Sequence, residues 1–291
     1  MSDPILVIGA TGTVGGATLR ALRAGGFAPA AFVRDAERAG ALLGGGVELR
    51  VGDLADPPSL RAALDDVDAV LLCSGHGPEM RQLQIDAVDV IAESGVERVV
   101  KISGSPASVR ADSTAELGRD HLAIEEALRA TACETVAIRP SIFMQTFLEQ
   151  SVAVAHGALP GLEGEPRVSF VDARDIGRVA AATLTSGETP DPVLEVTGPE
   201  ALTWFDVAGA MSAVLGRTVT HHPVPPEVAR QALLGMGRSE WLVTHMLELA
   251  ALSRDPKAAE VTDTVRRLSG RAPNSFGRFL AEHADAFPAA A

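Results

Sequence analysis

The stretch that decides the fold lies near the start of the chain and reads Ile5-Leu-Val-Ile-Gly9-Ala-Thr-Gly12-Thr-Val-Gly15-Gly16. An apolar run typical of a buried strand enters three evenly spaced glycines, and an amphipathic stretch follows at once. Gly9 permits a tight turn, Gly12 lets a pyrophosphate approach the backbone, and Gly15 lets helix and strand pack closely. The helix N-terminus then offers free N–H groups to phosphates. The pattern predicts a dinucleotide-binding unit.

The residues between these glycines extend the predicted cofactor site. Thr11 and Thr13 offer hydroxyl donors, and Val14 opens the helix. No Gly-Lys-Ser/Thr sequence follows, which excludes a nucleoside triphosphate loop. A purely structural glycine-rich turn is the alternative interpretation.

The first half of the chain alternates short apolar runs with amphipathic stretches. Apolar runs without polar alternation are typical of a parallel sheet that is buried on both faces. We therefore expect an α/β fold with a doubly wound, Rossmann-like parallel sheet. The predicted strands are Ile5–Ile8, Pro29–Val33, Val47–Val51, Ala69–Cys73, Arg98–Ile102 and Thr135–Arg139, and the predicted helices are Val14–Ala24, Pro58–Leu64, Met80–Ser94 and Ala115–Thr131.

The alternation of apolar and amphipathic stretches becomes less regular in the second half of the chain. Residues 1–140 are expected to form the dinucleotide-binding lobe, and residues 141–291 a smaller, mostly helical lobe that covers the substrate. A strand and helix around 168–185 are expected to return to the first lobe. Other predictions are a helix at Phe143–Ala155, a loop at His156–Pro166, a strand at Val168–Phe170 and helices at Pro226–Leu234, Ser239–Ala251 and Ser275–Ala286.

Charge and composition narrow the class of protein. The 291 residues carry 25 Lys and Arg against 38 Asp and Glu, a net charge of −13, which argues against nucleic acid as a primary partner. The N-terminal segment has neither the basic start nor the long apolar run of a signal peptide, so we expect a cytoplasmic protein without a membrane span. Cys73 and Cys133 fit reduced, buried thiols, and no metal site is expected. A monomer and a homodimer both remain open.

The end of the second predicted strand bears on the choice of dinucleotide. Arg34 follows this strand directly, and Arg38 lies one helical turn further on. Two arginines at this place would attract the 2′-phosphate of NADP(H), whereas an acid would bind the ribose of NAD(H). Asp35 is the competing acidic residue. We expect NADP(H) to be preferred, with two solvated surface arginines as the alternative.

Polar residues also follow the next two predicted strands, where the carboxyl ends of parallel strands line a ligand crevice. Asp53 and Leu54 are placed to contact the adenine, although a turn or helix-capping aspartate is the alternative. Ser74 and Gly75 are candidate cofactor contacts. His76 could face the substrate beside the nicotinamide, or be a solvated loop histidine.

With these segments placed, the chain resembles the NmrA-like branch of the short-chain dehydrogenase/reductase superfamily. Within that branch it looks most like members of the triphenylmethane-reductase and NAD(P)H:quinone-oxidoreductase type. The matching segments are Gly9 to Gly15, Val33-Arg34-Asp35, Gly52-Asp53-Leu54, Val99 to Ser103, His121 to Leu128, Ile138-Arg139-Pro140, Phe143-Met144, Val171 to Gly177 and Leu268 to Phe276. The resemblance spans essentially the whole chain.

The resemblance also shows where this chain departs from the superfamily. Typical members carry Tyr-x-x-x-Lys on one helix, whereas the matching stretch here is His121-x-x-x-Glu125, and the chain contains no tyrosine. His121 is a candidate general acid, since an ordinary histidine titrates near pH 6.5, about where such an acid works best. The alternative is an orienting histidine bonded to Glu125. Ser103 matches the region of the active-site serine and is a candidate contact to cofactor or substrate, or a turn-capping residue.

The resemblance places Pro140 near the nicotinamide and the following segment along a substrate pocket. Phe143, Met144 and Phe147 are the candidates there, and plain core packing is the alternative. On the helical tail, Met236 and Trp241 are expected to close the other side of the pocket.

Without a tyrosyl acid, the chemistry best supported is hydride transfer to an electrophilic small molecule. Reducing an unactivated ketone needs a placed proton donor, whereas a quinone, iminium or dye-like acceptor is less demanding. We therefore expect an NADPH-dependent reductase of such acceptors. The alternative is a non-catalytic NAD(P)-sensing regulatory protein of the NmrA type.

Overall fold

The computed structural model describes residues 4–161, 163–188 and 191–289, and its centre is a seven-stranded parallel sheet. The strand order is β3-β2-β1-β4-β5-β6-β8, so the chain crosses over between β3 and β4, as in a doubly wound fold. The strands are β1 Ile5–Ile8, β2 Ala30–Val33, β3 Glu48–Val51, β4 Ala69–Leu72, β5 Arg98–Ile102, β6 Glu134–Pro140 and β8 Val193–Val196. The predicted fold class is confirmed.

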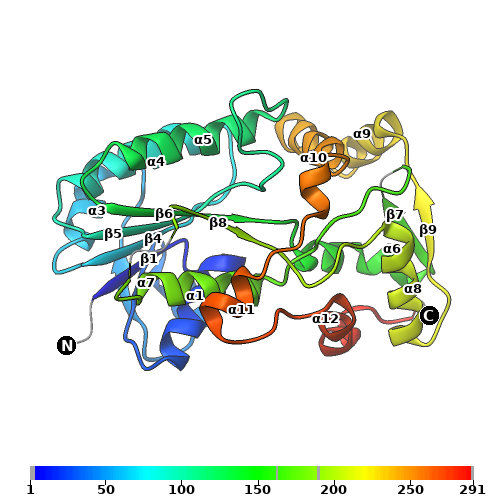
Figure 1. The fold of residues 1–291 in the computed structure, drawn as a ribbon, viewed down its shortest axis with the longest axis horizontal. Helices are drawn as coiled ribbons and strands as arrows, with labels where there is room; N and C mark the ends of the chain where they lie inside the picture. Colours follow the sequence, from blue (N-terminus) through cyan, green and yellow to red (C-terminus); the bar gives the residue numbers. More distant parts are fainter. Residues whose placement is uncertain (1–3, 162, 189–190, 290–291) are drawn as a thin grey trace.

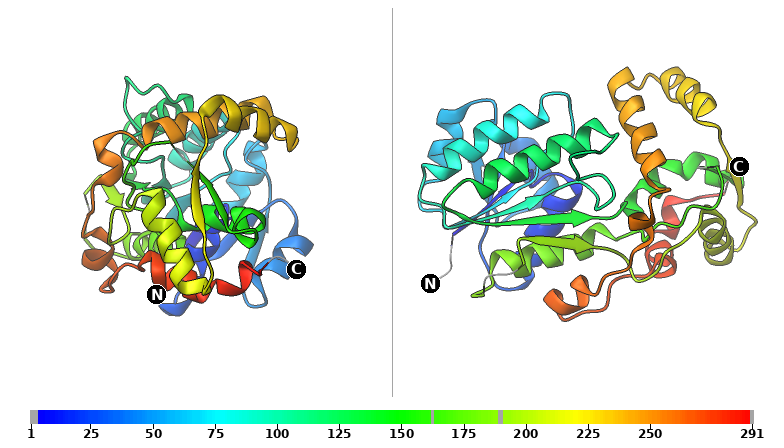
Figure 2. Two further views of the ribbon diagram at one scale, coloured as in Figure 1. Left: turned by 90° about the vertical axis from the view of Figure 1, so that its right-hand side faces the viewer. Right: turned by 45° about the horizontal axis from the view of Figure 1, so that its top comes forward.

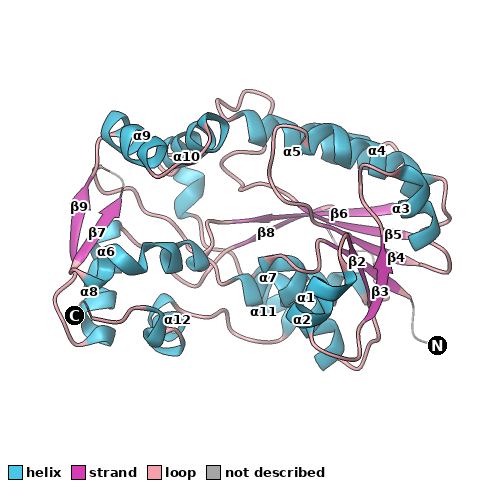
Figure 3. Ribbon diagram, turned by 180° about the vertical axis from the view of Figure 1, so that it is seen from behind, coloured by secondary structure: helices cyan, strands magenta, loops and turns pink. Residues whose placement is uncertain are grey.

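Helices cover both faces of this sheet (Figure 1). One face carries α1 Thr13–Ala24, α2 Ala36–Leu43, α7 Ala173–Leu184 and α11 Thr264–Ser269, and the other carries α3 Pro57–Ala63, α4 Met80–Ala92 and α5 Glu116–Arg129. Figure 3 shows the same two layers from behind. Because both faces are covered, β1, β2 and β4 consist entirely of buried residues.

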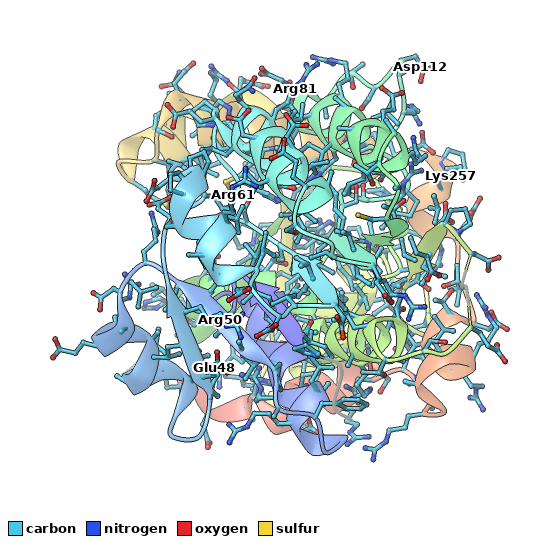
Figure 4. The ribbon with its side chains drawn as sticks, turned by 90° about the vertical axis from the view of Figure 1, so that its left-hand side faces the viewer. Glu48, Arg50, Arg61, Arg81, Asp112 and Lys257 are labelled. Carbon is cyan, nitrogen blue, oxygen red and sulfur yellow. The ribbon has the colours of Figure 1, made fainter. Side chains whose placement is uncertain are left out.

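Hydrogen bonds from the Arg50 side chain connect the edge strand β3 to the end of α3. Arg50 donates to the Glu48 carboxylate at 2.7 Å and also to the carbonyl oxygens of Ala63 and Asp65, at the end of α3. Figure 4 shows Glu48 and Arg50 on this side of the molecule, among charged side chains of both signs. No helix in the described part of the chain is long and apolar enough to cross a bilayer.

A second lobe lies at one end of the sheet (Figure 2). It is built around a two-stranded parallel sheet and a core that includes Phe147, Phe170, Phe276 and Phe279. Its elements are η1 Met144–Gln150, α6 Ser151–Ala155, β7 Ala158–Gly161, α8 Trp204–Leu215, β9 Thr220–Pro223, α9 Pro226–Gly235, α10 Glu240–Leu252, η2 Pro256–Ala259, α12 Phe276–Glu282 and η3 Ala284–Ala286.

The two lobes interleave along the chain. Helix α7 packs on α1 and β8 pairs with β6, so both elements return to the first lobe after the chain has entered the second. Asp172 ties the lobes together, since its carboxylate caps α7 and accepts hydrogen bonds from Gln145 and Asn274.

Three local predictions were wrong. The segment predicted as a loop contains β7, which pairs with β9, some sixty residues further along the chain. Its Pro and Gly are residues that rarely occur inside strands, so the sequence shows no strand pattern there. The predicted helix at Phe143–Ala155 begins as a 3₁₀ helix, since Thr146 N–H bonds back to the Phe143 carbonyl. The predicted strand at Val168–Phe170 makes one isolated bridge at Val168 instead of a strand. Helix α2 was not predicted as a full helix.

Candidate functional site

The glycine loop has the geometry that the sequence predicts for its first and last glycines. Gly9 has φ of 77°, and a Cβ there would lie 1.8 Å from the Cys73 carbonyl oxygen. A Cβ on Gly15 would lie 2.1 Å from the Gly9 carbonyl oxygen. Neither position accepts a side chain, so the turn, β4 and α1 pack at backbone distance.

The N-terminus of α1 is open to a ligand. Thr11, Gly12 and Thr13 are exposed, and within the described chain no side chain caps the helix at Gly12. The backbone N–H groups of the first turn, which a capping side chain would otherwise bond, can therefore donate hydrogen bonds to an anion. Val14 is buried beneath them. A cavity of about 340 Å³ adjoins this turn, with walls formed by Thr11, Gly12, Thr13, Ala17, Arg20, Gln145, Ala173, Arg174 and His283. These residues fit the pyrophosphate of a dinucleotide.

Both arginines after β2 are exposed, and neither guanidinium forms an ion pair with any described residue. Arg34 directly follows Val33, the last residue of β2. Asp35 is the N-cap of α2, and its carboxylate accepts a hydrogen bond from the Arg38 N–H at 3.0 Å. The acidic residue that favoured NAD(H) is therefore engaged in capping a helix.

The next two strand ends hold local turns. Asp53 Oδ1 accepts a hydrogen bond from the Ala55 N–H at 3.0 Å and so stabilises a local turn. Leu54 packs against the core. After β4, Ser74 Oγ accepts from the Gln84 side chain at 2.7 Å. Gly75 and His76 are exposed.

A buried lysine lies at the centre of the site. Lys101 on β5 is fully buried, and its Nζ lies 2.8 Å from Gln84 Oε1, 3.1 Å from the Ile102 carbonyl oxygen and 3.1 Å from His121 Nδ1. Burial lowers the pKa of Lys101 to about 8, while Cys73 and Glu125 act in the opposite direction. The side chain is therefore mainly an ammonium at neutral pH.

This contact determines the tautomer of His121. An ammonium group only donates, so Nδ1 accepts the bond from Lys101 and the ring proton lies on Nε2. His121 is 3 % exposed, and its buried Nε2 has no hydrogen-bond partner among the described residues. Burial and the charge of Lys101 hold its pKa well below the ordinary value. His121 is thus a neutral hydrogen-bond donor, and the expectation of an ordinary histidine pKa is wrong.

Aromatic rings gather beside this donor. The His76 ring lies 5.7 Å from the His121 ring and 5.4 Å from the ring of His245 on α10. Trp241 stacks on His245 at 5.6 Å and packs against the core below α4 and α5. His245 Nδ1 is also buried without a partner in the described chain. The second lobe therefore contributes two rings to the site.

The other predicted polar residue, Ser103, belongs to a separate network. Its hydroxyl donates to Glu125 Oε1 at 2.6 Å. Glu125 also accepts from Arg139 on β6 at 2.6 Å and from Arg129 at 2.7 Å. His121 therefore bonds Lys101, and the alternative of a His121–Glu125 bond is not what the structure shows.

The remaining pocket candidates are dispersed. Met144 and Phe147 are buried in the core of the second lobe, where Phe147 lies 5.0 Å from the Phe170 ring, so they present no surface to a substrate. Their burial follows from the 3₁₀ turn, which directs both side chains inward. Phe143 is half-buried and Pro140 is buried at the end of β6. Met236 is 74 % exposed at the end of α9.

The sequence interpretation missed Lys101, Gln84 and His245. One feature pointed to the first of them: Lys101 is one of two lysines in the chain and interrupts the apolar run Val99–Ile102 of a strand that is expected to be buried. A lysine is almost never fully buried unless it is paired. Gln84 and His245 lie on helices whose packing partners are far away in the sequence, so no local pattern marks them.

A family model described as the NmrA-like family matches residues 1–265. The chain belongs to the NmrA-like family. This membership confirms the resemblance seen in the sequence. An NAD(P)H azoreductase of Xenophilus azovorans is 36 % identical over 287 residues, which cover 98 % of this chain and 100 % of that protein.

Two further proteins are similar to this chain over nearly their full length. A (4-alkanoyl-5-oxo-2,5-dihydrofuran-3-yl)methyl phosphate reductase of Streptomyces griseus is 33 % identical, with 97 % of this chain and 99 % of that protein covered. The structure of a Citrobacter triphenylmethane reductase complexed with NADP(H) has a TM-score of 0.83 and 25 % identity, with 96 % and 99 % covered. All three relatives are named as reductases.

Proposed function

We propose that this protein is an NADPH-dependent reductase that passes a hydride to an electrophilic small molecule. One observation carries the proposal: a buried N–H donor, His121 Nε2, has no protein partner in the described chain and lies on the helix that follows β5. A buried donor without a partner costs about 1–3 kcal/mol, so it is best explained by a ligand atom that it serves. Family membership and NAD(P)H-linked relatives support the same reaction class.

The cofactor, when bound, supplies the hydride. The residues of this chain hold and orient it: the uncapped α1 N-terminus and Gly12 face the pyrophosphate, and Arg34 with Arg38 attracts the 2′-phosphate. Asp53 and Leu54 border the adenine, while Ser74, Gly75 and Pro140 lie towards the nicotinamide, at the carboxyl ends of β4 and β6.

The acceptor lies against the rings of His76, Trp241 and His245, with His121 as the donor to its reduced end. Since His121 is neutral, it stabilises developing negative charge by hydrogen bonding. Electrophilic acceptors, whose reduction spreads charge over several atoms, suit such a site.

An acceptor panel tests this proposal. The purified protein is mixed anaerobically with NADPH and a quinone, an azo dye, a triarylmethane dye or a plain ketone, and the loss of NADPH absorbance is followed. We expect turnover of the electrophiles and none of the ketone. If NADPH binds but no acceptor is turned over, the reductase proposal is wrong and a sensing role takes its place.

The cofactor preference has its own test. Arg34→Ala removes one of two unpaired guanidinium groups, so NADPH should bind roughly tenfold more weakly, as expected for one charge-assisted contact. NADH affinity should change less than twofold. Equal losses for NADPH and NADH, measured by calorimetry, would contradict a 2′-phosphate site here. Arg23→Ala, on the last turn of α1, is the matched control.

A further inference from the structure

We propose that Lys101 supplies, through His121, the proton that completes the reduction, and that the site consequently favours neutral conjugated acceptors with an oxygen or nitrogen to protonate over cationic ones. This inference rests on the proposed function and specifies its substrate class. His121 is the catalytic residue in this scheme, since its Nε2 touches the acceptor. Lys101 acts through His121 and never contacts the acceptor itself.

Three hydrogen-bond acceptors surround Lys101, one for each proton of its ammonium group. Gln84 Oε1, the Ile102 carbonyl oxygen and His121 Nδ1 all lie 2.8–3.1 Å from Nζ. Gln84 is held in place by its own bond to Ser74, which leaves its oxygen towards the lysine. One of the three ammonium protons therefore points at the imidazole.

The same contacts also suit Lys101 after it has lost a proton. A neutral amine donates two hydrogen bonds and accepts one. It would still donate to Gln84 and to the Ile102 carbonyl oxygen, and would accept the bond from a His121 ring that now carries its proton on Nδ1. Both proton positions are thus satisfied without movement of a heavy atom, which is what a relay requires.

The transfer balances as follows. The acceptor's double bond takes a hydride, with its two electrons, at one atom and the His121 Nε2 proton at the other. As the Nε2–H bond breaks, Nδ1 takes a proton from Lys101 Nζ, and the lysine is left as a neutral amine. After product leaves, a proton from solvent adds to Nε2 and the Nδ1 proton returns to Nζ. Each turnover consumes one proton from solvent.

The groups around Lys101 and His121 determine which of the two carries the charge before the reaction. Burial is the main cause of the lowered pKa of Lys101 and of His121, and the ammonium adds to the effect on the ring. The exposed His76, in the β4–α4 loop, lies beside His121, and His245 on α10 lies beside His76. Burial lowers the pKa of His245. Cys73 on the β4 side, Glu125 on α5 and Arg139 on β6 complete the surroundings. Charged Lys101 therefore faces a neutral imidazole.

The buried ammonium also discriminates between acceptors. A cationic acceptor is repelled by Lys101, and its hydride product needs no proton. A neutral acceptor becomes negatively charged as the hydride arrives, so the positive charge and the Nε2 donor both stabilise it. The relay is therefore useful only for neutral acceptors.

Substitution of the two lysines of the chain, one at a time, tests the relay. Lys257 serves as the matched control for Lys101. Lys101→Met keeps an unbranched side chain of similar length and removes the proton source, whereas Lys257→Met alters an exposed residue on η2. We expect Lys101→Met and His121→Ala to lower kcat for a quinone or azo dye by roughly tenfold or more. Turnover of a triarylmethane cation should not fall in either variant, and in Lys101→Met the loss of the repelling charge should raise it. His156→Ala and Lys257→Met should leave both substrates unaffected.

A measurement without turnover covers the case in which Lys101→Met fails to fold. Lysine labelled with ¹³C at Cε gives two signals, and Lys257→Met assigns them. We expect the Lys101 signal to titrate near pH 8, and the ¹⁵N shifts of His121 to show a proton on Nε2. In His121→Gln the Lys101 titration should move by at least half a pH unit. A His121 proton on Nδ1 below the Lys101 titration would overturn the relay.

The outcomes separate the two proposals. If the wild type reduces nothing, the reductase proposal fails, while the lysine titration still reports whether Lys101 and His121 share a proton. If the wild type is active but neutral and cationic acceptors lose activity equally in Lys101→Met and His121→Ala, the reductase stands and the relay fails.

Discussion

Strand β5 and helix α5 are joined by two buried polar pairs, Lys101 with His121 and Ser103 with Glu125, placed next to each other along both elements. Glu125 is met by the Ser103 hydroxyl and by two guanidinium groups, so its carboxylate is fully bonded. The Lys101 pair ends in His121 Nε2, a donor without a partner in the described chain.

The difference shows how a structural network is told from a functional one. Both pairs are buried and both include a charge, so burial alone does not separate them. A network with every donor and acceptor bonded stabilises the fold and has nothing to offer a ligand. A network with one open end carries a cost that a bound ligand removes.

The largest expected effect comes from breaking the closed pair. Glu125→Gln removes the negative charge opposite the half-buried Arg139, and loss of one partner of a buried ion pair costs about 3–5 kcal/mol. We expect the free energy of unfolding in urea to fall by about 3 kcal/mol. The ratio of kcat for neutral and cationic acceptors should stay within twofold.

Glu126→Gln is the control, since Glu126 is the exposed neighbour of Glu125 on the same helix. Its effect on stability should be below about 0.5 kcal/mol. A Glu125→Gln protein as stable as the wild type would mean that the closed pair contributes no more to the fold than the open one.

A smaller effect is expected for Ser103→Ala. The variant removes one bond to a charged group but leaves Glu125 with both arginines, so the free energy of unfolding should fall by about 1.5–3 kcal/mol. The Ser103 proton is committed to Glu125, so the acceptor ratio should again be unchanged. If kcat for neutral acceptors alone fell by more than tenfold, Ser103 would belong to the same functional network as Lys101 and His121. Thr114→Ala, at an exposed position, is the control.

The smallest effect concerns pH and the open pair. The folded-state pKa of His121 lies well below its ordinary value of 6.5, so below that pH the unfolded chain binds more protons than the folded one. Stability should therefore fall as pH falls, by at most about 1.4 kcal/mol per pH unit for this residue. In His121→Gln the slope of stability between pH 6.5 and 5.5 should be shallower. An unchanged slope would contradict burial of a neutral His121, and His156→Gln is the surface control.

Local patterns along the chain were enough for the sheet and for the glycine loop. Backbone conformation at Gly9 and close packing at Gly15 depend on residues within one strand, one turn and one helix, so spacing alone reveals them. Strand β7 and the burial of Met144 and Phe147 were not accessible in this way. Their partners lie on β9 and on aromatic side chains far along the chain.

The sequence by itself determined the dinucleotide-binding fold, the NmrA-like resemblance and the absence of a tyrosyl acid, because each is a property of residue identity and short-range spacing. Only the tertiary structure decided what stands in that place. Lys101, Gln84, His121, His76 and His245 come from five segments, and packing alone brings them together. The protonation of a buried group depends on which neighbours replace its water, and that is a property of the folded chain.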